Sequence, residues 1–200
     1  MKPMRLILAP FALLALAVPA AAEKIPLSAL SAYLNRLTTA EADFKQVNAD
    51  GSISNGRVFI RRPGRARFEY APPEKSLVMA GGGQVAIFDA KSNQPPAQYP
   101  LSRTPLGLIL AETVDLGRAR MVVAHQEVAN TTRVVAQDPA NPQYGTIELV
   151  FTANPVALRQ WVITDDTGSQ TTVILGQMKQ GANLPASLFS IPGEMGKRGL

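Results

Sequence analysis

Short runs in which apolar and polar residues alternate recur along the chain between residues 42 and 176. Ten such runs stand at 42–46, 58–60, 66–70, 77–79, 85–87, 120–128, 133–137, 145–151, 158–164 and 171–176. The segments between them, such as NADGSISNG, APPE, AGGG and DPANPQYG, are rich in the residues that form turns. A period of two places alternate side chains on opposite faces of a strand. The pattern therefore predicts about ten short antiparallel strands in a sandwich or barrel.

Two segments carry helix signals instead. Residues 27–37 repeat leucine and tyrosine at spacings of three and four, which predicts one apolar stripe on a helix that begins near Pro26. Residues 104–111, TPLGLILA, predict a short helix with Thr104 as its cap and Pro105 in its first turn. Nearly all faces of this second helix are apolar. The C-terminal KRGL sequence is expected to be a loose basic tail.

The first 22 residues have the features of a cleavable secretory signal. Lys2 and Arg5 form its positive start, residues 6–18 are apolar but too short for a stable membrane helix, and the alanines at 20–22 suit a signal peptidase. We expect cleavage after residue 22 and a single domain over residues 23–200. The chain has no cysteine to carry the acyl groups of a lipoprotein, so the mature protein is expected to be soluble and unanchored.

The charge balance argues against a nucleic-acid partner. Without the two basic residues of the predicted signal, 18 basic residues face 15 acidic ones, and the formal net charge falls from +5 to +3. Proteins that bind nucleic acid through a basic face are usually much more basic than this. The absence of cysteine also means that the exported chain must be stabilised by packing and not by disulfides.

The sequence RRPGRARFEY at residues 61–70 contains four arginines, which do not share one face. By alternation, Arg65, Arg67 and Glu69 point to one side of a strand, and Phe68 and Tyr70 point to the other. We interpret the charged side as a solvated outer face. The aromatic side is then expected to line something apolar.

Arg62 has a different position from the other arginines. Counting by twos puts it on the same face as Val58 and Ile60. A guanidinium at the rim of an apolar surface must find backbone carbonyls or a ligand headgroup, because an unpaired charge there is costly. Arg62 is therefore a candidate for one of these two contacts.

The motifs that suggest catalysis have simpler explanations. His125 is the single histidine, and there is no cysteine, so a zinc site and a histidine-based triad are excluded. DTGS at 166–169 matches an aspartic-protease motif, but that chemistry needs a second carboxylate and no second copy occurs. We interpret DTGS, and GGG at 81–83, as hairpin turns. No enzyme activity, metal or other cofactor is expected.

The order of segments along the mature chain is distinctive as a whole. A leading helix is followed by FKQVNADGSISNGRVFIRRPGRARFEYAPPEKSLVMAGGGQVAIFD, TPLGLIL, LRQWVITDDTGSQTTVILG and NLPASLFSIPG, over about residues 27–193. The most specific parts are Phe44-x-Gln46, Arg62-Pro63-Gly64-Arg65, Phe68-Glu69-Tyr70 and Leu188-Phe189 with Pro192-Gly193. In these features the sequence resembles the LolA family, the periplasmic carriers of outer-membrane lipoproteins.

The resemblance implies a fold and a function. The implied fold is mainly β with α: an unclosed, strongly bent antiparallel β-barrel of about ten to eleven strands, with a helical lid enclosing an apolar cavity. Family members hold the acyl chains of lipoproteins, which they receive from the inner-membrane ABC transporter LolCDE and pass to the outer-membrane receptor LolB or a substitute. The chain would then be a monomeric carrier in the periplasm of a Gram-negative bacterium. Its lack of an ATP motif agrees with energy supplied by the transporter.

The resemblance also implies roles for single residues. The family's gating arginine, which bonds to the backbone of the closed lid, falls on Arg62. At Ala66 the family usually has a larger residue, which implies a roomier cavity or a weaker lid contact here. The candidate cavity residues are Val58, Ile60, Ala66, Phe68, Tyr70, Met79, Ile87, Ile109, Met121 and Trp161. Taken singly, such residues are more often ordinary core than cavity wall.

Two other classes of function are alternatives to the carrier. A periplasmic sensor of lipids or lipoproteins could use the same half-barrel to control a protease, and a further domain after the barrel would favour it. An enzyme would need a nucleophile or a metal cluster, which the motifs do not provide. Capture of acylated proteins from the periplasm would identify the cargo.

Overall fold

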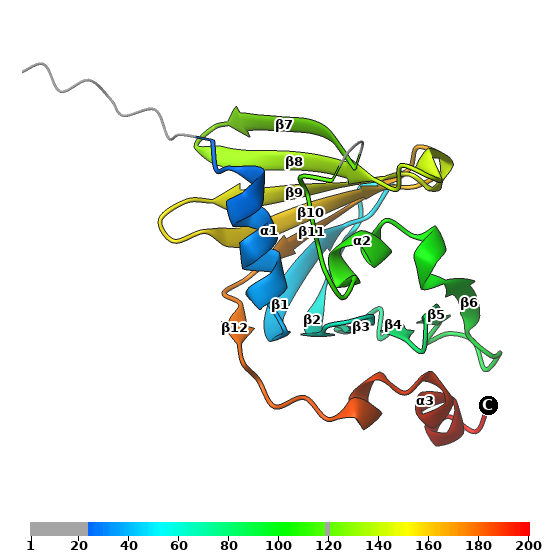
Figure 1. The fold of residues 1–200 in the computed structure, drawn as a ribbon. Coiled ribbons are helices and arrows are strands. Elements are labelled where there is room, and N and C mark those ends of the chain that lie inside the picture. The colour runs from blue at the N-terminus through cyan, green and yellow to red at the C-terminus, as the bar shows by residue number, and fades with distance from the viewer. Residues whose placement is uncertain (1–23, 119–120) are drawn as a thin grey trace, which may run out of the picture.

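The computed structural model describes residues 24–118 and 121–200, and the predicted signal at residues 1–22 lies outside them (Figure 1). The helices are α1 Leu27–Arg36, α2 Leu106–Leu110 and α3 Ile191–Lys197, with the short 3-10 helices η1 Leu101–Arg103, η2 Pro142–Tyr144 and η3 Ala186–Phe189. The strands are β1 Thr39–Val47, β2 Ile53–Arg61, β3 Arg65–Tyr70, β4 Leu77–Gly81, β5 Gln84–Phe88, β6 Ala97–Pro100, β7 Val122–Val128, β8 Thr131–Gln137, β9 Thr146–Thr152, β10 Ala157–Thr164, β11 Gln170–Leu175 and β12 Lys179–Gln180.

All twelve strands belong to one antiparallel sheet. Its order is β6-β5-β4-β3-β2-β1-β11-β10-β9-β8-β7, and β12 pairs with β1. Because β1 pairs with both β2 and β11, it joins the N-terminal strands to the C-terminal ones. The alternating runs predicted ten of these strands. The other two, β6 and β12, have four and two residues and were not predicted.

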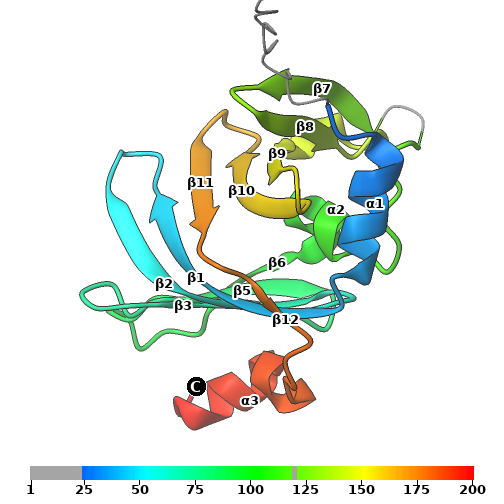
Figure 2. The same cartoon turned by 90° about the vertical axis from the view of Figure 1, so that its left-hand side faces the viewer.

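The sheet curls without closing. In Figure 2 the strands β3 to β5 and the strands β7 and β8 lie on opposite sides of the concave space, and α1 and α2 lie at its open side. β6 and β7 are the two ends of the strand order. The prediction of a mainly β, unclosed and strongly bent antiparallel barrel with a helical lid is confirmed.

The hairpins form where the sequence predicted turns. β4 and β5 are joined through Gly82 and Gly83, whose positive φ angles of 58° and 76° suit glycine. Between β10 and β11, Asp165 Oδ1 accepts hydrogen bonds from the N–H groups of Thr167 and Ser169, each 2.9 to 3.0 Å away. The DTGS sequence is therefore part of a turn.

The main hydrophobic core lies between the concave face and the two lid helices. α1 contributes Leu30 and Leu34 to it, as the apolar stripe predicted. α2 contributes Leu106, Ile109 and Leu110. A helix of five residues is not stable alone. Burial of these three side chains, at about 1.5 to 3 kcal/mol each, helps to hold α2 in place.

A second, smaller core lies on the outer face of the sheet. Leu77, Met79, Ala86 and Phe88 from β4 and β5 are buried there against Ile191 of α3. Figure 2 shows α3 on the side of the sheet away from α1 and α2. The prediction of a loose KRGL tail is wrong: Lys197 ends the third helix, Arg198 donates to Glu194 at 3.0 Å, and Leu200 packs partly buried against this second core.

The predicted placement of Met79 in the cavity is also wrong. Its side chain lies in this second core, on the outer face of the sheet. Met79 pairs with Arg67, and the next residue, Ala80, pairs with Ala66. Residues paired across antiparallel strands share a face, so Met79 points outward with Arg67. The β4 sequence LVMAG has no polar side chain, and alternation within it cannot show which residues face inward.

The interpretation of Arg67 as part of a solvated face is wrong as well. Its side chain is 12% exposed, and it donates to Glu69 at 2.6 Å and to Glu194 of α3 at 3.1 Å. It also donates to the carbonyl of Leu188 at 3.3 Å, and Arg198 donates to the same Glu194 at 3.0 Å. Arg67 therefore attaches the C-terminal segment to β3.

Candidate functional site

The inward face of β2 and β3 is apolar. Val58 pairs with Phe68, and Ile60 pairs with Ala66. All four side chains are at most 6% exposed. Tyr70 follows Phe68 on the same face of β3. The register thus places on one face the residues that alternation predicted there.

Four aromatic rings meet over this face. Phe44 of β1 lies edge-on to Phe68 and Tyr70, with ring centroids 5.8 and 5.2 Å apart. Trp161 of β10 lies edge-on to Phe68 at 6.2 Å. Gly56 leaves the space that the Phe44 ring fills, because a Cβ atom there would lie 2.8 Å from that ring. Edge-to-face pairs of this kind are favourable beyond their buried area.

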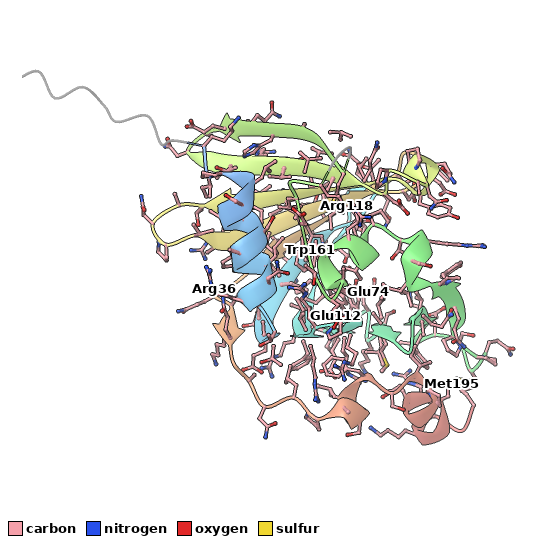
Figure 3. The ribbon with its side chains drawn as sticks, in the orientation of Figure 1. Arg36, Glu74, Glu112, Arg118, Trp161 and Met195 are labelled. Carbon is pink, nitrogen blue, oxygen red and sulfur yellow. The ribbon has the colours of Figure 1, made fainter. Side chains whose placement is uncertain are left out.

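A cavity of about 280 Å³ adjoins the aromatic cluster. Its floor consists of Phe68, Val85, Leu106, Trp161 and Val173, each at most 8% exposed. Figure 3 shows Trp161 within the curved sheet near α2. The remaining lining residues are Gln46, Tyr70, Val78, Ile87, Thr104, Ile163 and Thr171. Such a lining suits a hydrocarbon chain, because apolar burial is favourable and has no directional requirement.

The predicted cavity residues fall into three groups. Those that line the cavity are Phe68, Tyr70, Ile87 and Trp161. Those that lie in the core between sheet and lid are Val58, Ile60, Ala66 and Ile109, with Met121 partly buried against it. Met79 alone lies in the outer core.

Several lining residues were not predicted from the sequence. Gln46 could have been predicted, because it stands two residues after Phe44 on β1 and so shares its inward face. Val78 stands in a strand without polar residues, where alternation cannot show which side chains face the cavity. Val173 is identified only by its pairing with Trp161 across β10 and β11.

Arg62 connects the sheet to both lid helices. Its guanidinium donates to the carbonyl of Leu34 in the last turn of α1. It also donates to the Ala111 carbonyl just after α2, at 2.6 Å from Nη2 and 3.2 Å from Nε. Nη2 lies 3.3 Å from Asn35 Oδ1 and 3.4 Å from the Glu112 carbonyl. Carbonyls at helix ends lack helical partners and carry partial negative charge, which a guanidinium satisfies.

The charge of Arg62 persists in these partly buried surroundings. Burial lowers the pKa of its guanidinium, but the ordinary pKa of an arginine lies so far above neutral that the side chain stays protonated. Charge-assisted hydrogen bonds contribute about 1.5 to 3 kcal/mol each. The closed lid therefore depends in part on a few strong, directional contacts.

A second set of hydrogen bonds ties α1 to the segment after α2. Asn35 Nδ2 donates to the carbonyl of Val114, and Asn35 Oδ1 accepts from the N–H of Val114, both at 2.9 Å. Ser31 Oγ accepts from the N–H of Leu116 at 3.0 Å. These contacts bring Asn35 into the same network as Arg62.

A larger cavity, of about 520 Å³, lies against another side of α2. Its lining includes Pro63 and Gly64 from the turn between β2 and β3, and Asp138 and Tyr144 from the segment before β9. Thr104, just before α2, lines both cavities. The start of α2 therefore separates the two spaces.

Within residues 24–118 and 121–200, no group of His, Asp and Glu side chains is arranged to hold a metal ion. His125 Nε2 lies 2.9 Å from the Ile25 carbonyl, which ties β7 to the start of the described chain. Among the helices of these residues, none has both the length and the apolar character needed to cross a membrane.

Comparison with known proteins places this geometry in a family. Residues 35–192 match the family model described as outer membrane lipoprotein carrier protein LolA. The outer-membrane lipoprotein carrier protein of Methylococcus capsulatus is 25% identical over 176 residues, which cover 84% of this chain and 84% of that protein. The protein of the same description from Chromobacterium violaceum is 26% identical over 197 residues, covering 95% and 94%.

Solved structures resemble the chain more remotely. A putative outer membrane lipoprotein-sorting protein domain from Vibrio parahaemolyticus has a TM-score of 0.48 and 9% identity, covering 82% of this chain and 94% of that one. The MucA/MucB complex of Pseudomonas aeruginosa contains a chain with a TM-score of 0.43 and 16% identity, covering 82% and 59%. Likenesses at this level do not bear on function. The family model, in contrast, matches most of the sequence, and the chain belongs to the LolA family.

Proposed function

We propose that this chain is a periplasmic carrier that encloses the acyl chains of lipoproteins released from the inner membrane and delivers them to the outer membrane. The observation that carries the proposal is an apolar cavity covered by a short helix, with Arg62 bonded to the carbonyl just after that helix. The relatives described as outer-membrane lipoprotein carrier proteins support the same function.

The physical need for such a carrier is large. Three acyl chains expose on the order of forty-five methylene groups, and at about 0.8 kcal/mol each their transfer into water costs tens of kcal/mol. A carrier must cover this surface and later release it. Apolar contacts with Phe68, Val173 and Trp161 are broad and non-directional, which suits both tasks.

The closed cavity is too small for this cargo. Its volume of about 280 Å³ lies below the roughly 300 to 1,000 Å³ of sites that hold one drug-sized molecule. Cargo must therefore displace α2, which would join the cavity to the larger space beside it and break the contacts of Arg62 with Ala111. Lid closure then competes with cargo, so the loaded state is only modestly favoured and an acceptor can remove the lipoprotein.

The proposed partners follow from this cycle. An inner-membrane transporter of the LolCDE type would supply both cargo and energy, and LolB or a substitute would accept the cargo at the outer membrane. We propose that residues 23–200 act as one domain and as a monomer, without a cofactor and without catalysis.

Two exposed isoleucines allow a matched test of the cavity. Ile87 lines the cavity and is 42% exposed. Ile174 is 41% exposed and stands next to Val173, whose side chain faces the cavity, so Ile174 faces outward. A photocrosslinking residue is placed at each position in cells, and the captured proteins are identified by mass spectrometry. The proposal expects acylated proteins at position 87 and few at position 174; equal capture would contradict it.

Crosslinking alone does not separate a carrier from a lipoprotein sensor. The loaded protein is therefore mixed with outer-membrane vesicles, and bound and delivered lipoprotein are measured separately. A carrier delivers its cargo. A protein that captures lipoprotein at position 87 but never releases it to the vesicles would be a sensor instead.

A further inference from the structure

The apolar cavity has a polar end formed by Gln46, Tyr70 and Thr171, which all line it. Gln46 pairs with Val173 across β1 and β11, and Thr171 lies two residues from Val173 on the same face. The Tyr70 hydroxyl lies 2.7 Å from Gln46 Oε1. All three side chains are partly exposed, whereas the aromatic floor is buried. The polar groups therefore form a rim above an apolar pocket.

The side-chain amide of Gln46 is held in one orientation. Tyr70 donates its hydroxyl hydrogen to Gln46 Oε1, and Gln46 Nε2 donates one hydrogen to Asn48 Oδ1 at 2.6 Å. Asn48 donates in turn to the hydroxyls of Ser52 and Ser54, at 2.9 and 3.1 Å. A side-chain amide has two N–H hydrogens, and the second one of Gln46 meets no acceptor within residues 24–118 and 121–200. A fixed donor is thus available at the rim.

The rim has no charge that would recognise an anion. No Lys, Arg or His is found among the described residues that line the cavity. The pKa of the Tyr70 hydroxyl is raised to about 12, mainly by burial. The hydrogen bond to Gln46 lowers this pKa, and the negative charge of Glu74 raises it further. Carboxylates and phosphates are normally bound by cations, and Glu74 would repel them. The site therefore matches a neutral hydrogen-bond acceptor.

We propose that Gln46 and Thr171, with Gln46 positioned by Tyr70, bind the carbonyl oxygen of the ester or amide bond that joins an acyl chain to the lipid-modified cysteine of the cargo. The inference rests on the proposed function, in which acyl chains occupy the cavity. A chain on the apolar floor brings its carbonyl to the rim. Moving a carbonyl out of water is unfavourable unless it finds a hydrogen-bond donor. The site therefore selects acyl chains that are linked through a carbonyl, and it fixes how deeply they enter the cavity.

The test uses two synthetic lipopeptides whose hydrocarbon chains have equal length. One is an S-diacylglyceryl-cysteine peptide with ester links, and the other carries ether links in place of the esters. Both are kept below micelle-forming concentrations. Binding to the mature chain is followed by the fluorescence of Trp161, the single tryptophan, which lines the cavity. The variants are Gln46→Leu and Thr171→Val. The matched controls, Gln160→Leu and Thr172→Val, stand beside inward-facing residues and so point outward.

We expect the parent to bind the ester ligand more tightly than the ether twin. Gln46→Leu and Thr171→Val are each expected to weaken ester binding by roughly 3- to 10-fold and to leave ether binding unchanged, while both controls bind like the parent. Equal affinity of the parent for both ligands, or equal losses for both in the variants, would overturn the inference.

The outcomes also separate this inference from the proposed function. If neither lipopeptide binds the parent, the carrier proposal fails; if both bind alike, only the polar site fails. Circular dichroism reports whether each variant is folded. Thr171→Val removes one hydroxyl and keeps the shape of the side chain, so it provides the test even if Gln46→Leu does not fold.

Discussion

The indole ring of Trp161 on β10 meets the ring of Phe68 on β3 edge-on, with centroids 6.2 Å apart, although three strands lie between them in the sheet. Neighbouring strands are about 4.8 Å apart, so four steps across a flat sheet would separate the two residues by roughly 19 Å. Their contact therefore shows how strongly the sheet bends. The same two rings form part of the cavity floor, so the bend creates the site.

Removal of the Phe68 ring is expected to destabilise the fold. Phe68→Ala is expected to lower the free energy of unfolding by about 3 kcal/mol, because the ring is buried and contacts Phe44 and Trp161. Urea unfolding followed by circular dichroism measures this. The control is Phe59→Ala on the outer face of β2, where the ring lies under Arg57; its loss is expected to be about 1 kcal/mol or less. Equal losses would mean that the Phe68–Trp161 contact does not support the bend.

Arg62→Leu is expected to uncouple loading from delivery. Without the contacts to Leu34 and Ala111, lid closure no longer competes with acyl chains, so the variant is expected to accept lipoprotein and retain it. A reconstituted transfer assay measures bound and delivered lipoprotein separately. Arg65→Leu is the control, because within residues 24–118 and 121–200 Arg65 donates only to the nearby Arg61 carbonyl, at 3.3 Å. Delivery by Arg62→Leu at the parent's level would show that Arg62 is not the gate.

Asn35→Ala is expected to loosen the segment after α2 at one point. The Val114 N–H loses its acceptor, Asn35 Oδ1, and its exchange with solvent deuterium is expected to rise roughly tenfold. Hydrogen exchange followed by NMR reports each amide. The Leu116 N–H, which donates to Ser31, is the internal control and is expected to stay protected. Unchanged exchange at Val114 would mean that the Asn35 contact contributes nothing to closure.

Glu194 is expected to give the attachment of α3 a dependence on pH. Burial raises the pKa of its carboxyl, but hydrogen bonds from Arg198 and Arg67 and their positive charges outweigh burial, so the folded-state pKa lies below the usual 4.5. A lowered folded-state pKa means that ionised Glu194 stabilises the fold above pH 4.5, and that this contribution is lost as pH falls through the folded-state pKa.

The substitution Glu194→Gln tests this contribution. At pH 7 the variant is expected to be less stable than the parent by about 1 to 3 kcal/mol, and the difference is expected to shrink as the pH is lowered below 4.5. Urea unfolding across this range measures it. Glu41→Gln, which removes an exposed pair with Arg57, is the control and is expected to cost less than about 1 kcal/mol. A difference that stays constant with pH would show that the charge of Glu194 is not what attaches α3.

Much of the fold was predictable because it is local. The strand positions, the hairpin turns and α1 follow from periods and turn residues that lie next to one another in the chain. The inward face of Val58, Ile60, Phe68 and Tyr70 follows from alternation with charged neighbours. Arg62 was identified in the same way, because its parity placed a charge on an apolar face and required a partner.

Other features depend on pairing between distant segments. The side on which Met79 lies follows from its register with Arg67, since β4 itself has no polar residue to show a face. α3 was missed because IPGEMGK carries little apolar periodicity; its position is fixed by Ile191 in the outer core and by Glu194 beneath Arg67.

The sequence by itself determined ten of the twelve strands, the first helix, the family and the residue that joins sheet to lid. Only the tertiary structure decided the outer helix, the side on which Met79 lies, and the meeting of Gln46, Tyr70 and Thr171 at the end of the cavity. The physical reason is the range of the interactions. Alternation and turn preferences act within a few residues, whereas the bend and the cavity arise from contacts such as Phe68 with Trp161, residues that are close only after the whole sheet has formed.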